Sequence, residues 1–171
     1  MDEHETATWL RIATRRVVAS FLDALARSHG WHKVFVISPW ISAFGEAGGM
    51  TFTQFLKRLK DDDATAYIVS RPPIEMWHRS ALEQLAATGK ANIALVATLH
   101  TKLYCADTDQ GSFAMLGSAN FTEQSLTNRE IGIILRDAGA GRQLVRNLFY
   151  EASDIYRSPD RTLLCRRRLG G

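Results

Sequence analysis

The chain has 171 residues, close to the usual size of one domain. It is 46% hydrophobic and 23% charged, with 12 glycines and 4 prolines, and this ordinary globular usage excludes disorder over most of its length. No apolar run approaches the roughly 18 residues that span a bilayer. Residues 1–5 are acidic where a secretion signal would be basic and then apolar, so we expect a soluble protein without a targeting segment.

Cysteine usage and charge bear on the compartment and the partners. Two cysteines, Cys105 and Cys165, cannot build a disulfide framework, which favours a reducing, cytoplasmic compartment. Lysine and arginine number 21 against 18 acidic residues, a net charge of +3. The basic residues cluster at Arg15-Arg16, at Arg161 and over 166–168, where they are either solvated surface charge or contacts to nucleic acid.

The first half of the chain alternates predicted helices and strands. Apolar residues spaced by three and four predict a helix over about 7–28, ended by Gly30. Thr51 and Gln54 match a capping box that opens a helix to about Lys60. Short β-branched runs predict strands buried on both faces over 33–38, 66–69 and 93–96, and residues 74–87 predict a further helix.

In the second half, strands are predicted in close succession. They cover about 100–106, 113–117 and 130–135, with a turn at 107–111 and a closing helix over 144–156. The expected fold class is therefore α/β, a mixed β-sheet sandwiched between helices in three layers. We expect one catalytic domain over 1–160 and a basic C-terminal tail over 161–171.

Residues that suit phosphate chemistry gather in the second half. On a strand, His100 and Lys102 would project from the same face, about 6.6 Å apart. Imidazole can attack phosphorus or donate a proton, and a lysine ammonium is a compact partner for phosphate oxygens. Asn120 could add an amide donor and Ser118 a hydroxyl, so the pattern suits a phosphodiester.

These residues also form a recognisable motif. The pattern H-x-K-x₄-D followed by G-S-x-N resembles the signature of the phospholipase D superfamily, and it is carried by His100, Lys102, Asp107, Gly117, Ser118 and Asn120. The resemblance continues through residues 128–132, which read N-x-E-I-G. The rest of the chain is similar only in its order of strands and helices.

The resemblance implies a mechanism and a role for each residue. A histidine attacks the phosphodiester to give a phosphohistidine, a second histidine protonates the leaving oxygen, and water completes hydrolysis without metal or cofactor. His100 is then the nucleophile, Lys102 and Asn120 hold the phosphate, and Glu130 hydrogen-bonds the other ring nitrogen of His100.

Four further residues receive secondary roles. Asp107 and Gly117 are expected to be structural, Asp107 by accepting backbone N–H groups at the strand end. Ser118 either contacts phosphate or stabilises a turn. Arg71 follows a predicted strand and is either a contact to a substrate phosphate or a solvated arginine.

The motif occurs once, whereas the mechanism needs two histidines. Short members of the superfamily pair two chains, so a homodimer with a shared active site is expected. Such members include nonspecific endonucleases and restriction nucleases. We therefore expect DNA, rather than RNA, as substrate, partner proteins from a defence system and no stable membrane association. The alternatives are a phospholipase or other phosphodiester transferase and a nucleic-acid-binding assembly module without turnover.

Overall fold

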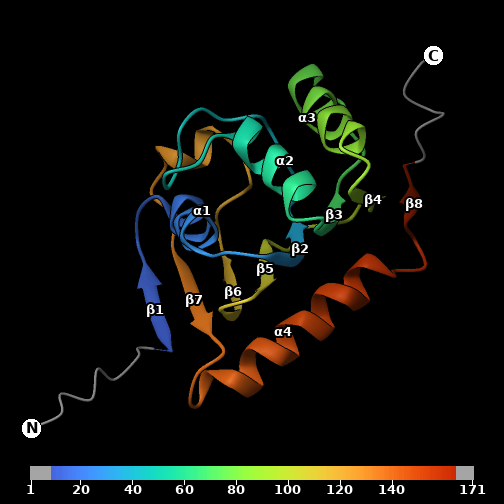
Figure 1. Ribbon diagram of the computed structural model, residues 1–171. Helices are drawn as coiled ribbons and strands as arrows, with labels where there is room; N and C mark the ends of the chain where they lie inside the picture. The colour runs from blue at the N-terminus through green and yellow to red at the C-terminus, as the bar shows by residue number, and fades with distance from the viewer. Residues whose placement is uncertain (1–8, 165–171) are drawn as a thin grey trace, which may run out of the picture.

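The computed structural model describes residues 9–164. Its strands are β1 (Leu10–Ala13), β2 (Trp31–Ile37), β3 (Thr65–Ser70), β4 (Ala91–Leu95), β5 (Leu103–Thr108), β6 (Gly111–Gly117), β7 (Gly132–Arg136) and β8 (Thr162–Leu163). They form one sheet in the order β1-β7-β6-β5-β2-β3-β4-β8 (Figure 1). The β2–β3 and β3–β4 pairs are parallel and the other pairs are antiparallel, which makes the sheet mixed.

Helices cover both faces of the sheet. On one face lie α1 (Val17–Arg27), α2 (Phe52–Asp61) and α3 (Met76–Ala87), and α4 (Gly141–Tyr156) crosses the other (Figure 1). Because side chains alternate along a strand, Val34 and Val36 of β2 pack with α1 and α2, whereas Phe35 and Ile37 pack with α4. The predicted three-layer α/β fold is confirmed.

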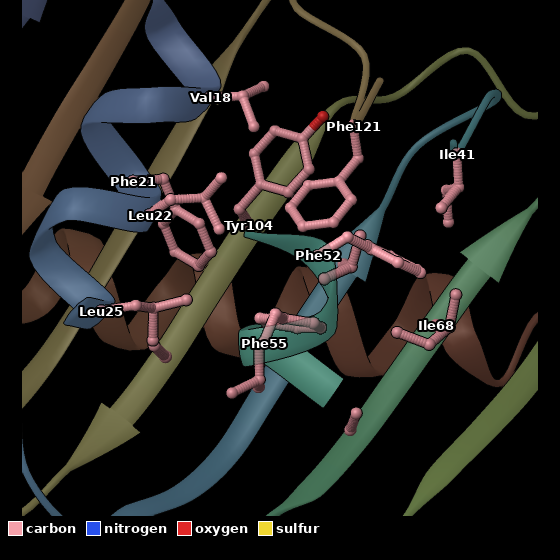
Figure 2. Packing of buried hydrophobic residues seen from close by; sticks show 14 of the residues in the cluster. Val18, Phe21, Leu22, Leu25, Ile41, Phe52, Phe55, Ile68, Tyr104 and Phe121 are labelled. Carbon is pink, nitrogen blue, oxygen red and sulfur yellow. The ribbon is translucent and has the colours of Figure 1, made fainter. Parts of the chain in front are cut away.

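Aromatic rings join the sheet to the layer of α1 and α2 (Figure 2). The ring of Tyr104 in β5 lies 5.6 Å from that of Phe21 in α1 and 5.7 Å from that of Phe121, measured between centroids. Phe121 also packs at 5.7 Å on Phe55 of α2. Burial of such large rings dominates the energetics of a core, so Phe121 anchors the segment that follows β6.

The predicted capping box of α2 is present. The backbone N–H of Gln54 donates to the Thr51 hydroxyl at 3.1 Å, and the backbone N–H of Thr51 donates to the Gln54 side chain at 2.7 Å. Two N–H groups that the helix itself cannot pair are thereby satisfied. The other predicted helices and strands are also present, with shifted ends, except at the two ends of the described chain and around His100.

The predicted helix over 7–28 is wrong in its first half. Leu10–Ala13 form β1, which pairs antiparallel with β7, and α1 begins only at Val17. Arg16 has a left-handed backbone with φ of 50°, which separates the two elements. Apolar spacing alone does not distinguish a long helix from a short edge strand followed by a helix, and the hydrogen bonds to β7 decide the outcome.

The predicted tail over 161–171 begins with a strand. Thr162 and Leu163 pair with β4, and the N–H of Leu164 donates to the carbonyl of Ile93 at 3.0 Å. A strand of two residues is too short to show a period in the sequence. The rest of the tail, with Cys165 and the arginines at 166–168, lies outside the described residues, as do residues 1–8.

One edge of the sheet collects the segments that carry the motif. Here β2, β3, β4 and β6 end and β5 and β7 begin, as shown by the pairs Ile37 with Leu103 and Gly117 with Gly132. We call this the site edge and the opposite one the far edge. The loops that meet at the site edge follow β2 and β3, join β4 to β5 and join β6 to β7, so they come from distant parts of the sequence.

Candidate active site

His100 and Lys102 lie in the irregular segment between β4 and β5, at the site edge. The predicted strand over 100–106 is wrong at its start, because β5 begins only after Lys102. Its partner β2 ends at Ile37, and Pro39 has no N–H to extend the ladder. Lys102 nevertheless stays beside His100, since its ammonium donates to the His100 carbonyl at 3.0 Å.

Arg71 reaches His100 from the end of β3. Its Nη2 lies 2.8 Å from Nε2 of His100, and its Nε donates to the carbonyl of Leu99 at 2.7 Å. The same Nη2 lies 3.2 Å from Nδ1 of His100, so the guanidinium faces the side of the ring between its two nitrogens. The imidazole therefore lies beside a cation that can hold a phosphate oxygen.

Asn120 is fixed by buried hydrogen bonds on both sides. The Tyr104 hydroxyl donates to the carbonyl of Ala119 at 2.6 Å, and the N–H of Phe121 donates to the Ser38 hydroxyl at 3.0 Å. Burial raises the pKa of Tyr104 well above its ordinary value of 10.0, which keeps the hydroxyl a neutral donor.

Neither Tyr104 nor Ser38 is among the site residues predicted from the sequence. Both had a positional signal, because Tyr104 stands inside the motif and Ser38 ends a buried strand that runs toward the site edge. They are positioning residues for Asn120.

A pocket of about 660 Å³ opens beside Asn120. Its walls include Trp40, Trp77, Glu75 and Glu123. The side-chain oxygen of Asn120 is buried and has no hydrogen-bond partner within residues 9–164. An unpaired buried acceptor costs about 1–3 kcal/mol, a cost that a donor on a bound molecule would remove.

Ser118 holds Glu130 in place. Its hydroxyl donates to the Glu130 carboxylate and accepts from the N–H of Ile131 at 3.1 Å. Between Glu130 and His100 of the same chain, no hydrogen bond is formed in the described structure, so the contact implied by the motif is absent from the single chain. In this structure the Ser118 hydroxyl joins the end of β6 to the segment before β7.

Gly117 allows β6 and β7 to approach closely. A Cβ at this position would lie 2.3 Å from the carbonyl oxygen of Ile131 and 2.7 Å from the Cα of Gly132. The Gly117 N–H also donates to the carbonyl of Lys102 at 3.3 Å. The glycine thus links three segments of the site, which explains its place in the motif.

Asp107 lies away from the site edge. It belongs to β5 rather than to a turn, and it accepts a hydrogen bond from the Ser112 hydroxyl at 2.7 Å. No backbone N–H of the described residues donates to it, so the expected role at a strand end is not met. Its role is structural in a different way, because it joins β5 to β6 across their hairpin.

The other described histidines form no hydrogen bond with His100. His78 is buried, and its Nε2 lies 2.8 Å from the Ser70 hydroxyl. His32 and His29 are at the far edge, where His32 contacts Asp109 at 2.8 Å. His4 lies outside the described residues.

No group of three or more His, Cys, Asp or Glu side chains within residues 9–164 is arranged to hold a metal ion. None of the helices in the same range has the length and apolar character required to cross a membrane.

Comparisons with known proteins connect this site to a family. The model of the family described as cardiolipin synthase, PLD-like domain, matches residues 15–151. No curated protein matched the chain. Among solved structures, Nuc, a phospholipase D family member from Salmonella typhimurium, is similar with a TM-score of 0.64 and 14% identity, over 91% of this chain and 97% of Nuc.

Two further structures share the fold. Phosphatidylserine synthase from Haemophilus influenzae has a TM-score of 0.62 and 13% identity, over 91% of this chain and 39% of the synthase. NucT from Helicobacter pylori has a TM-score of 0.54 and 12% identity, over 86% of this chain and 94% of NucT.

The fold and the matched domain define the class of the chain as phospholipase D-like. The chain belongs to the phospholipase D-like domain family, whose model matches most of its length.

Proposed function

We propose that the chain is a metal-independent endonuclease that cleaves DNA through a phosphohistidine on His100. The observation that carries the proposal is the convergence of His100, Lys102 and Arg71 at the site edge, which Asn120 also shares. An imidazole flanked by two cations suits attack on a phosphodiester, because the cations stabilise the charge that grows on the phosphate oxygens.

The proposed reaction has two displacements at phosphorus. In the first, Nε2 of His100 attacks, the bond to the leaving oxygen breaks, and a second, protonated histidine gives that oxygen its proton. In the second, the same histidine removes a proton from water, the water oxygen attacks, and the phosphorus–nitrogen bond breaks. Lys102, Asn120 and Arg71 hold phosphate oxygens.

The second histidine comes from a twofold-related copy of the chain. Of the described histidines, His78 is buried and the two others besides His100 lie at the far edge. An isologous homodimer would bring His100 of each copy to one shared site. It would also surround the phosphate with two copies of Lys102 and Asn120.

The placement of charge supports a nucleic-acid substrate. Ion pairs between described residues lie toward the far edge, namely Arg27–Asp23, His32–Asp109, Lys57–Asp61, Arg58–Asp62, Lys90–Asp63 and Arg142–Asp137. The site edge carries five cations that form no ion pair with a described carboxylate. They are Arg15, Arg16, Arg71, Lys102 and Arg129. Unpaired cations along one edge provide contacts to the backbone of a polyanion.

One observation favours lipid as a second candidate substrate. Ile74, Met76 and Trp77, at the start of α3, are 81%, 76% and 46% exposed. Apolar side chains at the rim of a phosphodiesterase site suit contact with a membrane interface. A phospholipase or another phosphodiester transferase would use the same catalytic residues.

The cellular setting belongs to the proposal as well. We place the protein in the cytoplasm, where the absence of a disulfide framework is expected, and among the nucleases of restriction or defence systems. Protection of cells against incoming phage DNA, lost in a His100→Ala strain, tests this role.

The test of the activity uses purified protein with labelled plasmid, single-stranded DNA, RNA of the same sequence and phosphatidylcholine vesicles, all in excess EDTA. We expect DNA cleavage that persists in EDTA and is absent from His100→Ala. Cleavage that requires added Mg²⁺ would contradict the charge roles of Lys102 and Arg71. Hydrolysis of vesicles alone would establish the lipid candidate, and tight DNA binding without any cleavage would establish an assembly module.

A further inference from the structure

The pocket beside Asn120 has aromatic and acidic walls that the phosphate chemistry does not use. We propose that it accepts one nucleobase of a single-stranded segment next to the scissile phosphate, stacked on Trp77. The inference rests on the proposed function and adds a substrate class, single-stranded or locally opened DNA, and a preference among bases.

Two contacts place the pocket next to the nucleophile. The guanidinium carbon of Arg71 lies 5.9 Å from the ring centroid of Trp40, a wall residue, while Nη2 of the same guanidinium is 2.8 Å from His100. Asn120 belongs both to the motif and to the pocket wall. In a nucleotide, one sugar separates the base from the phosphate, so a phosphate at His100 brings a neighbouring base within reach.

The aromatic wall is supported from behind. Trp77 is 46% exposed, and it stacks on buried His78 with centroids 5.7 Å apart and planes inclined by 28°. Trp40 packs 6.1 Å from Trp77 and 5.5 Å from His78, and Ser70 fixes His78 through its Nε2. A ring held in this way loses little freedom when a base stacks on it, and every base offers a flat face.

The polar wall selects the kind of group that can enter. Glu75, Glu123 and the unpaired oxygen of Asn120 are hydrogen-bond acceptors. One carboxylate oxygen of Glu123 already accepts from the N–H of Gly45 at 2.7 Å, which fixes this side chain. Carboxylates repel a second phosphate, whereas the exocyclic amines of cytosine, adenine and guanine are donors that carboxylates accept.

The acceptors in this wall disfavour a lipid in the pocket. An acyl chain would leave the buried oxygen of Asn120 unpaired, and an anionic headgroup would meet Glu75 and Glu123. Thymine has no exocyclic amine, and its single N3–H donor is flanked by two carbonyl oxygens that the acceptors of the wall repel. The pocket should therefore prefer cytosine to thymine, two bases of similar size.

The experiment measures binding in a His100→Ala background, so that no substrate is consumed. Anisotropy of labelled oligo-dC and oligo-dT of equal length gives the affinities. We expect oligo-dC to bind about fivefold more tightly than oligo-dT. Trp77→Leu should weaken oligo-dC binding about tenfold, and Trp77→Phe should restore most of it.

Control variants distinguish stacking on Trp77 from hydrogen bonding to Glu75. Tyr150→Leu removes an exposed aromatic ring from α4, on the other face of the sheet, and should leave the affinities unchanged. Glu75→Gln should reduce the preference for oligo-dC while leaving oligo-dT binding nearly the same. Thermal unfolding of each variant checks that the exposed substitutions preserve the fold.

Three results would overturn the proposal. The first is equal affinity of oligo-dC for Trp77→Leu and for its parent. The second is a Trp77→Leu variant that loses binding to phosphatidylglycerol vesicles but keeps its affinity for oligonucleotides. The third is a loss of dimer in sedimentation with unchanged oligonucleotide affinity, which would make Trp77 a subunit contact. Failure of the proposed nuclease function gives a different result from failure of the base pocket. In that case the wild-type protein cleaves no DNA, but its binding of oligo-dC still depends on Trp77.

Discussion

The guanidinium of Arg71 lies 2.8 Å from Nε2 of His100, although Arg71 leaves β3 and His100 precedes β5. In the sheet, β2 stands between these two strands, and the segment that carries His100 leaves β4, the other neighbour of β3. In the proposed mechanism, the phosphate of a substrate takes over this guanidinium when His100 attacks. Arg71 would then hold the imidazole in the free enzyme and one phosphate oxygen in the complex.

Replacing Arg71 tests this double role. Arg71→Ala should lower kcat/KM for DNA cleavage about 10- to 100-fold, the effect of losing one charge-assisted hydrogen bond. Arg71→Lys should recover only part of the loss, because an ammonium cannot contact Leu99 and phosphate with the same fork geometry. Arg142→Ala, which removes a cation at the far edge, serves as the control. Equal activity of Arg71→Ala and wild type would exclude a substrate contact.

Removal of the nucleophile separates chemistry from folding. His100→Ala should reduce turnover by several orders of magnitude, because no other described group at the site edge replaces the imidazole. The side chain is exposed, so the melting temperature should stay within about 1 °C of the wild type. His32→Ala, an exposed histidine at the far edge, should keep full activity. Normal turnover by His100→Ala would remove the phosphohistidine mechanism.

The sequence predicted the parts of the fold that are built from periodic patterns. Continuous apolar runs identify β2, β3 and β4 as strands buried on both faces, and Thr51 with Gln54 marks the start of α2. The motif letters identify His100, Lys102 and Asn120 as residues of one site. The short strands β1 and β8 escape prediction because their partners, β7 and β4, determine them.

The geometry of the site could not be predicted from periodic patterns in the sequence. If His100 and Lys102 were on a strand, the alternation of side chains would set the distance between them. However, β5 begins only at Leu103, because its partner β2 ends at Ile37. The contact between Arg71 and His100 depends on the order of strands in the sheet, which no local pattern encodes. The support of Asn120 by Tyr104 likewise depends on a hydrogen bond between neighbouring segments of the core.

Gly117 should be intolerant of any side chain. In Gly117→Ala the new Cβ would meet the backbone of Ile131 at 2.3 Å, so β6 and β7 must separate. We expect a loss of about 1–3 kcal/mol in the free energy of unfolding, measured by urea denaturation. Gly45→Ala is the matched control, since its Cβ would lie 3.8 Å from the nearest atom, the Glu123 carboxylate. Equal stability of the two variants would mean that the strands adjust without cost.

Buried His78 should make the fold sensitive to acid. Burial lowers its pKa from 6.5 to about 4, so the unfolded chain binds a proton between these values and the folded chain does not. Stability should therefore fall as the pH decreases through this window, by up to about 1.4 kcal/mol per pH unit, and stay unaffected by this group above it. Urea unfolding from pH 7.5 to 5 should show a smaller slope for His78→Gln. His32→Gln, at an exposed position, should retain the slope of the wild type.

The shared site can be tested by mixing subunits. If each site needs His100 from both chains, a heterodimer of wild-type and His100→Ala subunits lacks either its nucleophile or its acid. After complete exchange in an equal mixture, about one quarter of the dimers are wild type, so activity should fall to about one quarter of that of an all-wild-type sample. Independent sites would leave about one half instead. A parallel mixture with His32→Ala subunits should retain full activity, which controls for the exchange itself. A value near one half, or full specific activity from a monomer in sedimentation, would contradict the shared site and require the acid to come from the same chain.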